Sequence, residues 1–334
     1  MNNYMKRKIV YPDHSLLCII VLLLLPICSW SQTKYAESIT KDDILAIVNV
    51  LASDSLRGRE AGTADGLKAS NYLAEQYSSF DLLKGNKDSY FQKIPLRHND
   101  STYNVIGMIK GSEYPDEYVV ITAHYDHIGV RRGQIYKGAD DNASGTAALL
   151  EVGQAFMEAD KNGDGPKRSI LILAWGAEEK GLLGSAYYAD NDPIFPLTTV
   201  VANLNMDMIG HLDELHPEDP NFVSIVGSDW QSSELHQIHE AANEKYVGLS
   251  LDYTYNSKDH PERFFYRSDQ YNFAKYGIPV IFYTSGDHED YHKPTDTIAN
   301  LKIGRIQKVA QLVFYTAWEL ANRDKRISVD KPLE

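Results

Sequence analysis

The stretch from residue 169 to residue 179 reads Ser-Ile-Leu-Ile-Leu-Ala-Trp-Gly-Ala-Glu-Glu. Its first seven residues are almost all apolar, which is typical of a central strand that is covered on both faces. A similar run at 278–283 lies near the end of the chain, and segments with helical patterns separate the strand-like runs between them. Because alternating strands and helices favour parallel pairing, we expect a three-layer αβα sandwich with a mixed, mostly parallel central sheet.

Local signals of the same kind place the other elements. Thr40, with Asp43 three residues on, is typical of a helix N-cap. No repeat, low-complexity tract or Gly/Ser linker divides the chain, so we expect a single domain over residues 33–334. The expected strands are 90–96, 103–110, 118–123, 169–175, 199–206 and 279–284. The expected helices are 41–53, 64–79, 143–158, 181–190, 231–245, 268–276 and 303–321.

Metal-seeking side chains follow strand-like runs at five places along the chain. The carboxyl ends of parallel strands meet at one edge of an open sheet, so we expect these places to come together. Two imidazoles and several carboxylates, with no cysteine among them, suit a divalent ion such as zinc. The five segments are His124-Tyr125-Asp126, Asp140-Asp141-Asn142, Glu178-Glu179, Asp207 and Tyr291-His292.

The spacing within these segments divides the chemistry between neighbouring residues. Residues two apart on an extended chain lie on the same side, so one of His124 and Asp126 can ligate while the other orients it. Adjacent side chains point in different directions, so one carboxylate of Glu178-Glu179 can bind metal while the other acts as general base. A carboxylate in the tight turn before the helix at 143–158 has both oxygens free, which suits bridging two ions. Asp207 stands alone in an apolar setting, where a carboxylate needs a partner such as a metal.

Taken together and in this order, the motifs resemble family twenty-eight of the zinc metallopeptidases, the co-catalytic aminopeptidase type. The resemblance runs from about Leu56 to Leu301. It implies an aminopeptidase that acts on peptides and holds two zinc ions per chain. One zinc would be held by His124 and Asp207, the other by Glu179 and His292, and Asp141 would bridge them.

The same resemblance implies roles for residues around the ions. Asp126 would orient His124, and Glu178 would be the general base that later protonates the leaving amine. Tyr291 matches a tyrosine that polarises the scissile carbonyl in some members. The bridging aspartate of the family precedes a cis peptide bond, so we expect Asp141–Asn142 to be cis.

The amino terminus has the form of a secretory signal. A basic stretch, Lys6-Arg7-Lys8, precedes an apolar run from Leu16 to Leu25, which is shorter than the about 20 residues that span a membrane. We expect cleavage near residue 32, with secretion or export to the periplasm and no stable membrane insertion afterwards. Ile27 is bulky where lipoprotein signals usually carry a small residue, so we do not expect a lipid anchor at Cys28.

Charge excludes one class of partner. The formal net charge is -13, and residues 1–32 carry three basic and one acidic side chain, so their removal leaves -15. Such an acidic surface repels phosphate backbones, so we expect no nucleic-acid partner. The sequence does not fix the oligomeric state.

Three other interpretations of the same motifs stay open. A carboxypeptidase or dipeptidase would use the same residues, a glutaminyl cyclase-like acyltransferase would use one zinc, and a receptor-like domain would use none. The intact motifs around His124 and Asp141 indicate two ions and so argue against the cyclase. The receptor-like domain is disfavoured because every catalytic position is filled.

Several residues near these motifs have no assigned role. Gln270 follows Arg267-Ser268-Asp269, a segment that also resembles the family, but it stands where a histidine often follows. His127, His211 and His288 have no predicted partner, although His288 is close to the expected site in sequence.

Overall fold

Four strands that are buried on both faces form the centre of the sheet. β7 (Arg168–Trp175), β4 (Tyr114–His124), β8 (Val200–Met206) and β11 (Val280–Thr284) are adjacent and parallel. Every residue of β7, β8 and β11 is buried, as the continuous apolar runs predict. The structure is a computed structural model, and it describes residues 27–97, 100–331 and 333.

Antiparallel strands extend this centre to a mixed sheet of nine strands. The strand order is β1-β3-β7-β4-β8-β11-β9-β10, with β2 paired to β3. β3 is antiparallel to β7, and β9 is antiparallel to β11. The outer strands are β1 (Leu83–Lys84), β2 (Phe91–Pro95), β3 (Ser101–Ile109), β9 (Phe222–Val226) and β10 (Ser250–Asp252). A separate hairpin is formed by β5 (Gly129–Arg131) and β6 (Gln134–Tyr136).

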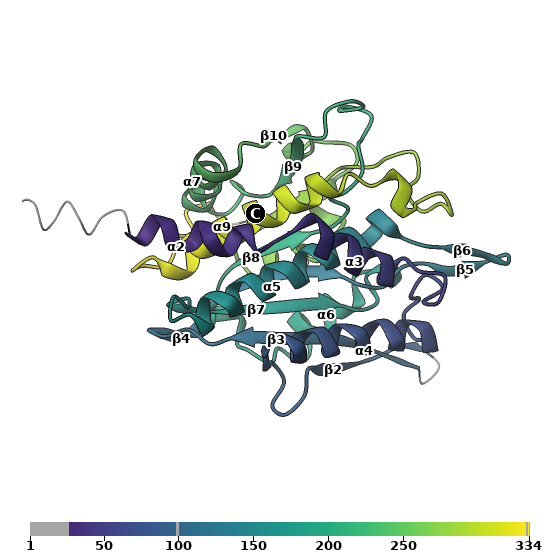
Figure 1. The fold of residues 1–334 in the computed structure, drawn as a ribbon, viewed down its shortest axis with the longest axis horizontal. Coiled ribbons are helices and arrows are strands. Elements are labelled where there is room, and N and C mark those ends of the chain that lie inside the picture. Colours follow the sequence, from purple (N-terminus) through teal and green to yellow (C-terminus); the bar gives the residue numbers. More distant parts are fainter. Residues whose placement is uncertain (1–26, 98–99, 332, 334) are drawn as a thin grey trace, which may run out of the picture.

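Helices cover both faces of the sheet, which confirms the αβα layering. Along β4, Val119 and Ile121 pack into one apolar core with α3, α4, α5 and α9, whereas Val120 packs into a second core on the other face with α6 and α8. Figure 1 shows α4, α5 and α9 in front of the strands. The helices are α2 (Ile27–Glu37), α3 (Lys41–Leu51), α4 (Ala64–Ser79), α5 (Gly145–Lys161), α6 (Leu183–Asp190), α7 (Ser233–Ala242), α8 (Tyr271–Ala274) and α9 (Ile303–Asn322). Among the helices of the described segments, none combines the length and the apolar character needed to cross a bilayer.

The expected helix starts agree well with the structure outside the segment 208–267. α4 has the predicted bounds, and the Thr40 hydroxyl caps α3 by accepting the N–H of Asp43 at 3.2 Å. Within 208–267, β9 and β10 were not predicted, and the helix expected to reach residue 245 ends as α7 at Ala242. There Asn243 exchanges two side-chain hydrogen bonds with the backbone of Leu249, which turns the chain.

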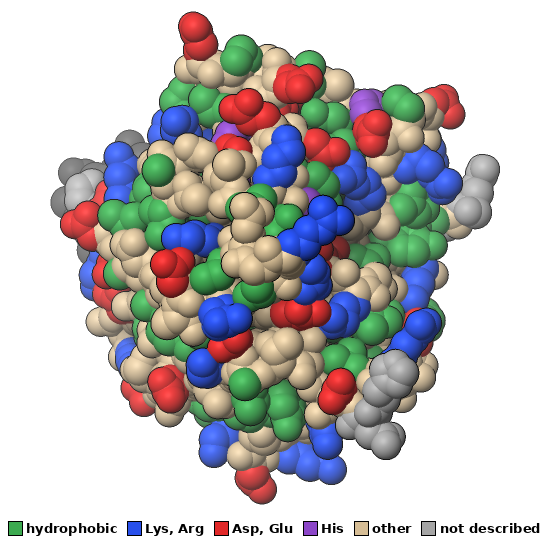
Figure 2. Space-filling view, turned by 90° about the vertical axis from the view of Figure 1, so that its right-hand side faces the viewer, with side chains coloured by type: hydrophobic (Ala, Val, Ile, Leu, Met, Phe, Trp, Pro, Cys, Tyr) green, Lys and Arg blue, Asp and Glu red, His purple; other side chains and the backbone are tan. Residues whose placement is uncertain are grey.

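The parallel strands β4, β7 and β8 end at one edge of the sheet, from which the β5–β6 hairpin projects in Figure 1. Figure 2 faces that side of the molecule. Acidic and basic side chains are intermixed there, and apolar side chains are scattered between them. This edge is where the predicted metal-seeking residues are expected.

Candidate metal centre

The first group of metal-seeking side chains lies where β4 and β8 end. His124 is the last residue of β4, Asp207 directly follows β8, and both are buried. Because the two strands are parallel neighbours, His124 Nε2 lies 3.0 Å from Asp207 Oδ1. The other ring nitrogen, Nδ1, lies 3.2 Å from the backbone carbonyl oxygen of Asp126. That contact fixes the ring so that Nε2 faces Asp207.

Asp141 lies between two sets of partners. It belongs to the buried turn Ala139–Ser144, and the peptide bond to Asn142 is cis, which confirms the prediction. Asp141 Oδ1 lies 3.4 Å from His124 Nε2, whereas Oδ2 lies 3.1 Å from His292 Nε2. A carboxylate with one oxygen on each side is arranged to bridge two ions.

Two buried charged groups hold the backbone of this turn. Asp296 accepts hydrogen bonds from the N–H groups of Asp140 at 2.8 Å and of Asp141 at 3.1 Å. Arg59 donates to the carbonyl oxygens of Gly138 at 2.9 Å and of Asp141 at 3.5 Å. Burial lowers the pKa of Arg59 to about 10, so its guanidinium stays charged at neutral pH. The Asp141 carboxylate is therefore positioned through its own backbone.

The second group gathers around Glu179. His292 Nε2 lies 3.2 Å from Glu179 Oε2, and His127 Nδ1 lies 2.7 Å from Glu179 Oε1. His127 Nδ1 also lies 3.5 Å from Asp141 Oδ2. Burial acts to raise the pKa of Glu179, but the two imidazoles outweigh it and lower that pKa. Glu179 is therefore an ionised carboxylate with an imidazole beside each oxygen.

Both groups fit zinc in donor type, and the contacts of His124 and His292 also fit it in spacing, whereas His127 Nδ1 and Glu179 Oε1 are closer, at 2.7 Å. Two ligands of a tetrahedral zinc with bonds of 2.0–2.1 Å lie about 3.3 Å apart. The contacts of His124 and His292 with their carboxylates span 3.0–3.4 Å. Nitrogen and carboxylate oxygen are also the ligand types that zinc accepts. Two sets of donors here have their ligand atoms within 4.8 Å of one another: His124, Asp141 and Asp207, and His127, Asp141 and Glu179; His211, His288 and Asp290 form a third such set.

Glu178 lies beside the first group and faces it. Its Oε2 is 3.9 Å from His124 Nε2. Burial raises the pKa of Glu178, and the charge of Asp207 adds to this while His124 opposes it. The backbone N–H of Glu178 donates to Asp126 Oδ1 at 3.0 Å. Asp126 therefore contacts His124 through its carbonyl oxygen and holds the Glu178 loop through its carboxylate.

Five of the predicted residues border one small cleft. The ring of Tyr291 stacks on that of His292, with 3.9 Å between centroids. Arg267 lies at the rim, where it donates to Asp287 at 2.9 Å. The cavity of about 30 Å³ is bounded by Asp141, Glu178, Asp207, His292, Tyr291, Met208, Phe264 and Phe282, among others.

Gln270 lies beneath the cleft and supports Asp207 indirectly. Its Oε1 accepts a hydrogen bond from Asn205 at 2.9 Å, and its Nε2 donates to the carbonyl oxygen of Phe265 at 3.0 Å. Asn205 also donates to the Ser268 hydroxyl, which in turn donates to Asp207 Oδ2 at 2.7 Å. The structure therefore gives this position a supporting role that the sequence left open.

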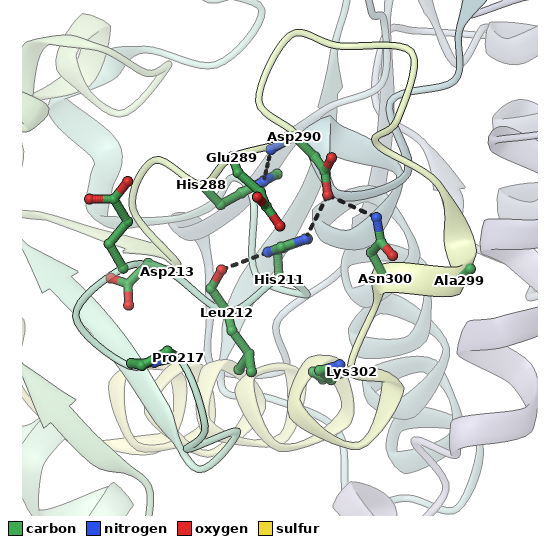
Figure 3. A pocket seen from close by; sticks show the side chains of 11 residues that line it. His211, Leu212, Asp213, Pro217, His288, Glu289, Asp290, Ala299, Asn300 and Lys302 are labelled. Carbon is green, nitrogen blue, oxygen red and sulfur yellow. Dashed lines mark hydrogen bonds and ion pairs between the residues drawn. The ribbon is translucent and has the colours of Figure 1, made fainter.

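A second cluster of histidines and carboxylates lies on the other side of Asp140. The rings of His211 and His288 stack 3.9 Å apart at an angle of 9° and border an open cavity of about 410 Å³ (Figure 3). His211 Nε2 lies 3.1 Å from Asp290 Oδ2, and His288 Nε2 lies 3.2 Å from Asp140 Oδ2. His288 is therefore close to the predicted centre but faces away from it, toward Asp140.

Sequence reasoning missed His127, which contacts both Glu179 and Asp141. β4 ends at His124, so side-chain alternation no longer indicates where the third residue after the strand points. Only a third imidazole close to a predicted ligand could have drawn attention to it.

Comparison with known proteins agrees with this geometry. Residues 104–317 match the family described as Peptidase family M28. The chain is 30% identical over 242 residues to aminopeptidase YwaD of Bacillus subtilis. The aligned residues make up 70% of this chain and 48% of that relative, so the chain spans about half of the relative's length. Its fold is similar to that of BSAP, a zinc aminopeptidase from Bacillus subtilis (TM-score 0.69, 18% identity, 89% of this chain and 98% of that chain). It is also similar to that of Porphyromonas gingivalis glutaminyl cyclase (TM-score 0.65, 18% identity, 83% of this chain and 97% of that chain). The chain belongs to peptidase family M28.

Proposed function

We propose that this protein is a zinc aminopeptidase that uses two zinc ions to release the amino-terminal residue of peptides. The observation that carries the proposal is the position of Asp141. One of its oxygens faces His124, which also contacts Asp207, and the other faces His292, which also contacts Glu179. Family membership and the similarity to an aminopeptidase support the same conclusion.

The residues around the centre suggest how the reaction proceeds. Bound zinc ions would supply a water of lowered pKa and positive charge for the oxyanion. Glu178 is the general base: it takes the proton of the attacking water and returns it to the leaving amine. The Tyr291 hydroxyl donates a hydrogen bond to the carbonyl oxygen as negative charge develops there. Asp126 is a positioning residue that holds both His124 and the Glu178 loop.

The experiment that tests the proposal is hydrolysis of a panel of aminoacyl-anilides and short peptides, each with a free and a blocked amino terminus. The protein is assayed as purified, after chelation, and after zinc is returned. We expect zinc-restored release of residues from the free amino terminus only. Equal cleavage of blocked substrates would overturn the aminopeptidase proposal.

The alternatives give different outcomes in the same assay. Release from the carboxyl terminus, or activity confined to dipeptides, would indicate a carboxypeptidase or dipeptidase with the same centre. One zinc per chain together with pyroglutamate formation would indicate a glutaminyl cyclase. No bound zinc and no turnover of any substrate would favour a receptor-like domain.

We also propose that residues 1–32 are a secretory signal and that residues 33–334 form the peptidase domain. Cleavage after Gln32 falls within α2 (Ile27–Glu37). Of the α2 residues that remain, Tyr35 and Ala36 are buried in the core and stay with the mature chain. The intact mass and amino-terminal sequence of exported protein test this. A full-length chain retained in the cytoplasm would contradict it.

A further inference from the structure

His127 is a buried imidazole held in place beside the second group of ligands. Its side chain is 0% exposed. Its ring packs against Gly138, where an added Cβ would lie 2.4 Å from the ring Cγ. A side chain at residue 138 would collide with the ring. Gly138 also has a positive φ of 55°, which favours glycine. The ring therefore cannot turn toward Gly138.

The contact between His127 and Glu179 is close but is not a hydrogen bond. The atoms Nδ1 and Oε1 are 2.7 Å apart, yet neither has a partner in hydrogen-bond geometry among the described residues. Two donor atoms that approach without pointing at each other can both point at a third atom. This is the arrangement of ligands around an ion.

The orientation of the two imidazoles supports this interpretation. A metal lies in the plane of the ring that binds it, so two imidazoles can share an ion only where their planes cross. The rings of His127 and His292 are inclined at 67°, with 5.9 Å between centroids. His127 approaches Glu179 Oε1 while His292 approaches Oε2, and both approach Asp141 Oδ2. The two rings are therefore not parallel, and both face the same two carboxylates.

We infer that His127 binds the second zinc ion through Nδ1, as a third imidazole ligand of the centre. The inference rests on the proposed two-zinc function and adds a ligand to it. The second ion then has His127, His292, Glu179 and Asp141, whereas the first has His124, Asp207 and Asp141. Two nitrogens at one ion and one at the other make the sites unequal. We expect the second site to bind zinc more tightly, because four protein ligands would complete a tetrahedral site there, whereas the first ion has three.

The test counts imidazole ligands directly. The full chain is labelled with ¹⁵N-histidine and loaded with ¹¹³Cd, and the scalar couplings between cadmium and ring nitrogens are recorded by NMR. We expect three coupled histidines: His124 and His292 through Nε2, and His127 through Nδ1. Coupling of His124 and His292 alone would overturn the inference while leaving the proposed function intact. Coupling of neither would overturn both.

Variants assign the third coupling and measure its effect. His127→Gln should remove one coupling and weaken the tighter of the two zinc sites more than about 100-fold, beyond the about 10–100-fold typical of losing an outer hydrogen-bond partner. The matched control is His211→Gln, which should keep three couplings and both affinities. Unchanged zinc affinity in a folded His127→Gln protein would contradict the inference. If that variant does not fold, the coupling count in the unmodified protein still decides.

Discussion

The molecule contains two histidine–carboxylate clusters that meet at the adjacent residues Asp140 and Asp141. The clusters differ in the groups that their ring nitrogens face. In the cluster around Asp141, His292 and His127 both approach Glu179 and Asp141, and His127 does so without hydrogen-bond geometry. In the cluster of Figure 3, His211 Nδ1 faces the carbonyl oxygen of Leu212 at 2.6 Å, and Nε2 faces Asp290. Carboxylates shared between imidazoles, more than proximity, separate the candidate metal centre from the cluster of Figure 3.

Ring orientation gives the same answer. His211 and His288 are nearly parallel, with an angle of 9° between their planes. Parallel planes do not cross, so one ion cannot lie in the plane of both rings. His288 Nδ1 also accepts the backbone N–H of Asp290 at 3.3 Å. Most contacts of this cluster are hydrogen bonds, although His288 Nε2 and Asp140 Oδ2 lie 3.2 Å apart without hydrogen-bond geometry.

The largest expected effect comes from substituting Asp141, which is adjacent in sequence to Asp140 of the other cluster. Asp141 faces the metal centre, whereas Asp140 faces His288. Asp141→Asn should reduce zinc from two to less than one per chain and abolish turnover, because both ions lose a shared charge. Metal analysis by mass spectrometry after gel filtration, together with the anilide assay, measures both effects.

Asp140→Asn is the matched control for that variant. It removes the charge beside His288 and should cost about 1–3 kcal/mol of unfolding free energy, since a buried partner is left unsatisfied. It should keep two zinc ions per chain. Loss of zinc from Asp140→Asn to the same extent as from Asp141→Asn would show that the two clusters act as one site.

The next largest effect is confined to catalysis. Glu178→Gln removes the general base and should lower kcat by about 10²–10⁴-fold. Both zinc ions should stay bound, because Glu178 does not belong to either close set of donors. Glu244→Gln, at an exposed position, is the control and should change neither. Substantial turnover in Glu178→Gln with full zinc occupancy would rule out Glu178 as the base.

The sequence predicted the parts of the fold that depend on local signals or on continuous apolar runs. The bounds of α4 and the Thr40 cap followed from such signals, and the fully buried strand β7 followed from its composition. β9 could not be predicted, because a five-residue run becomes a strand only by pairing with β11, far along the chain. α8 is shorter than expected because Ser268 and Gln270, just before it, bond to Asn205.

The predicted ligands come together because each belongs to a strand end or a marked turn. His124 and Asp207 are positioned by register alone, which sequence patterns capture. His127 and the clamp formed by Asp296 and Arg59 depend on contacts between distant loops. No local pattern encodes such contacts.

Removing zinc should distinguish the two clusters by its effect on the unfolding free energy. Zinc at about 1,000 times its dissociation constant adds about 4 kcal/mol to the unfolding free energy. Chelation should therefore lower the Tm by several degrees, and returned zinc should restore it. Differential scanning fluorimetry of His211→Gln should show the same zinc-dependent shift as the unmodified protein. A smaller shift in that variant would mean that the cluster of Figure 3 also binds zinc.

The smallest expected effect concerns Glu151, a buried carboxylate outside both clusters. Glu151 of α5 is 3% exposed, and the Thr40 N–H donates a long hydrogen bond of 3.4 Å to its carboxylate. Burial, with the charge of Asp43, raises the pKa of Glu151 to about 7. The folded protein then binds more protons than the unfolded chain between about pH 4.5 and 7, so stability falls as the pH rises through that window.

Glu151→Gln should raise the unfolding free energy by about 1–3 kcal/mol at pH 8 and by almost nothing at pH 4.5, measured by urea unfolding. The partly exposed Glu158→Gln on the same helix is the control, and an equal gain for Glu151→Gln at both pH values would contradict the explanation. Glu179, with an imidazole beside each oxygen, has a lowered pKa instead, so the groups around a buried carboxylate decide whether it is ready for a metal.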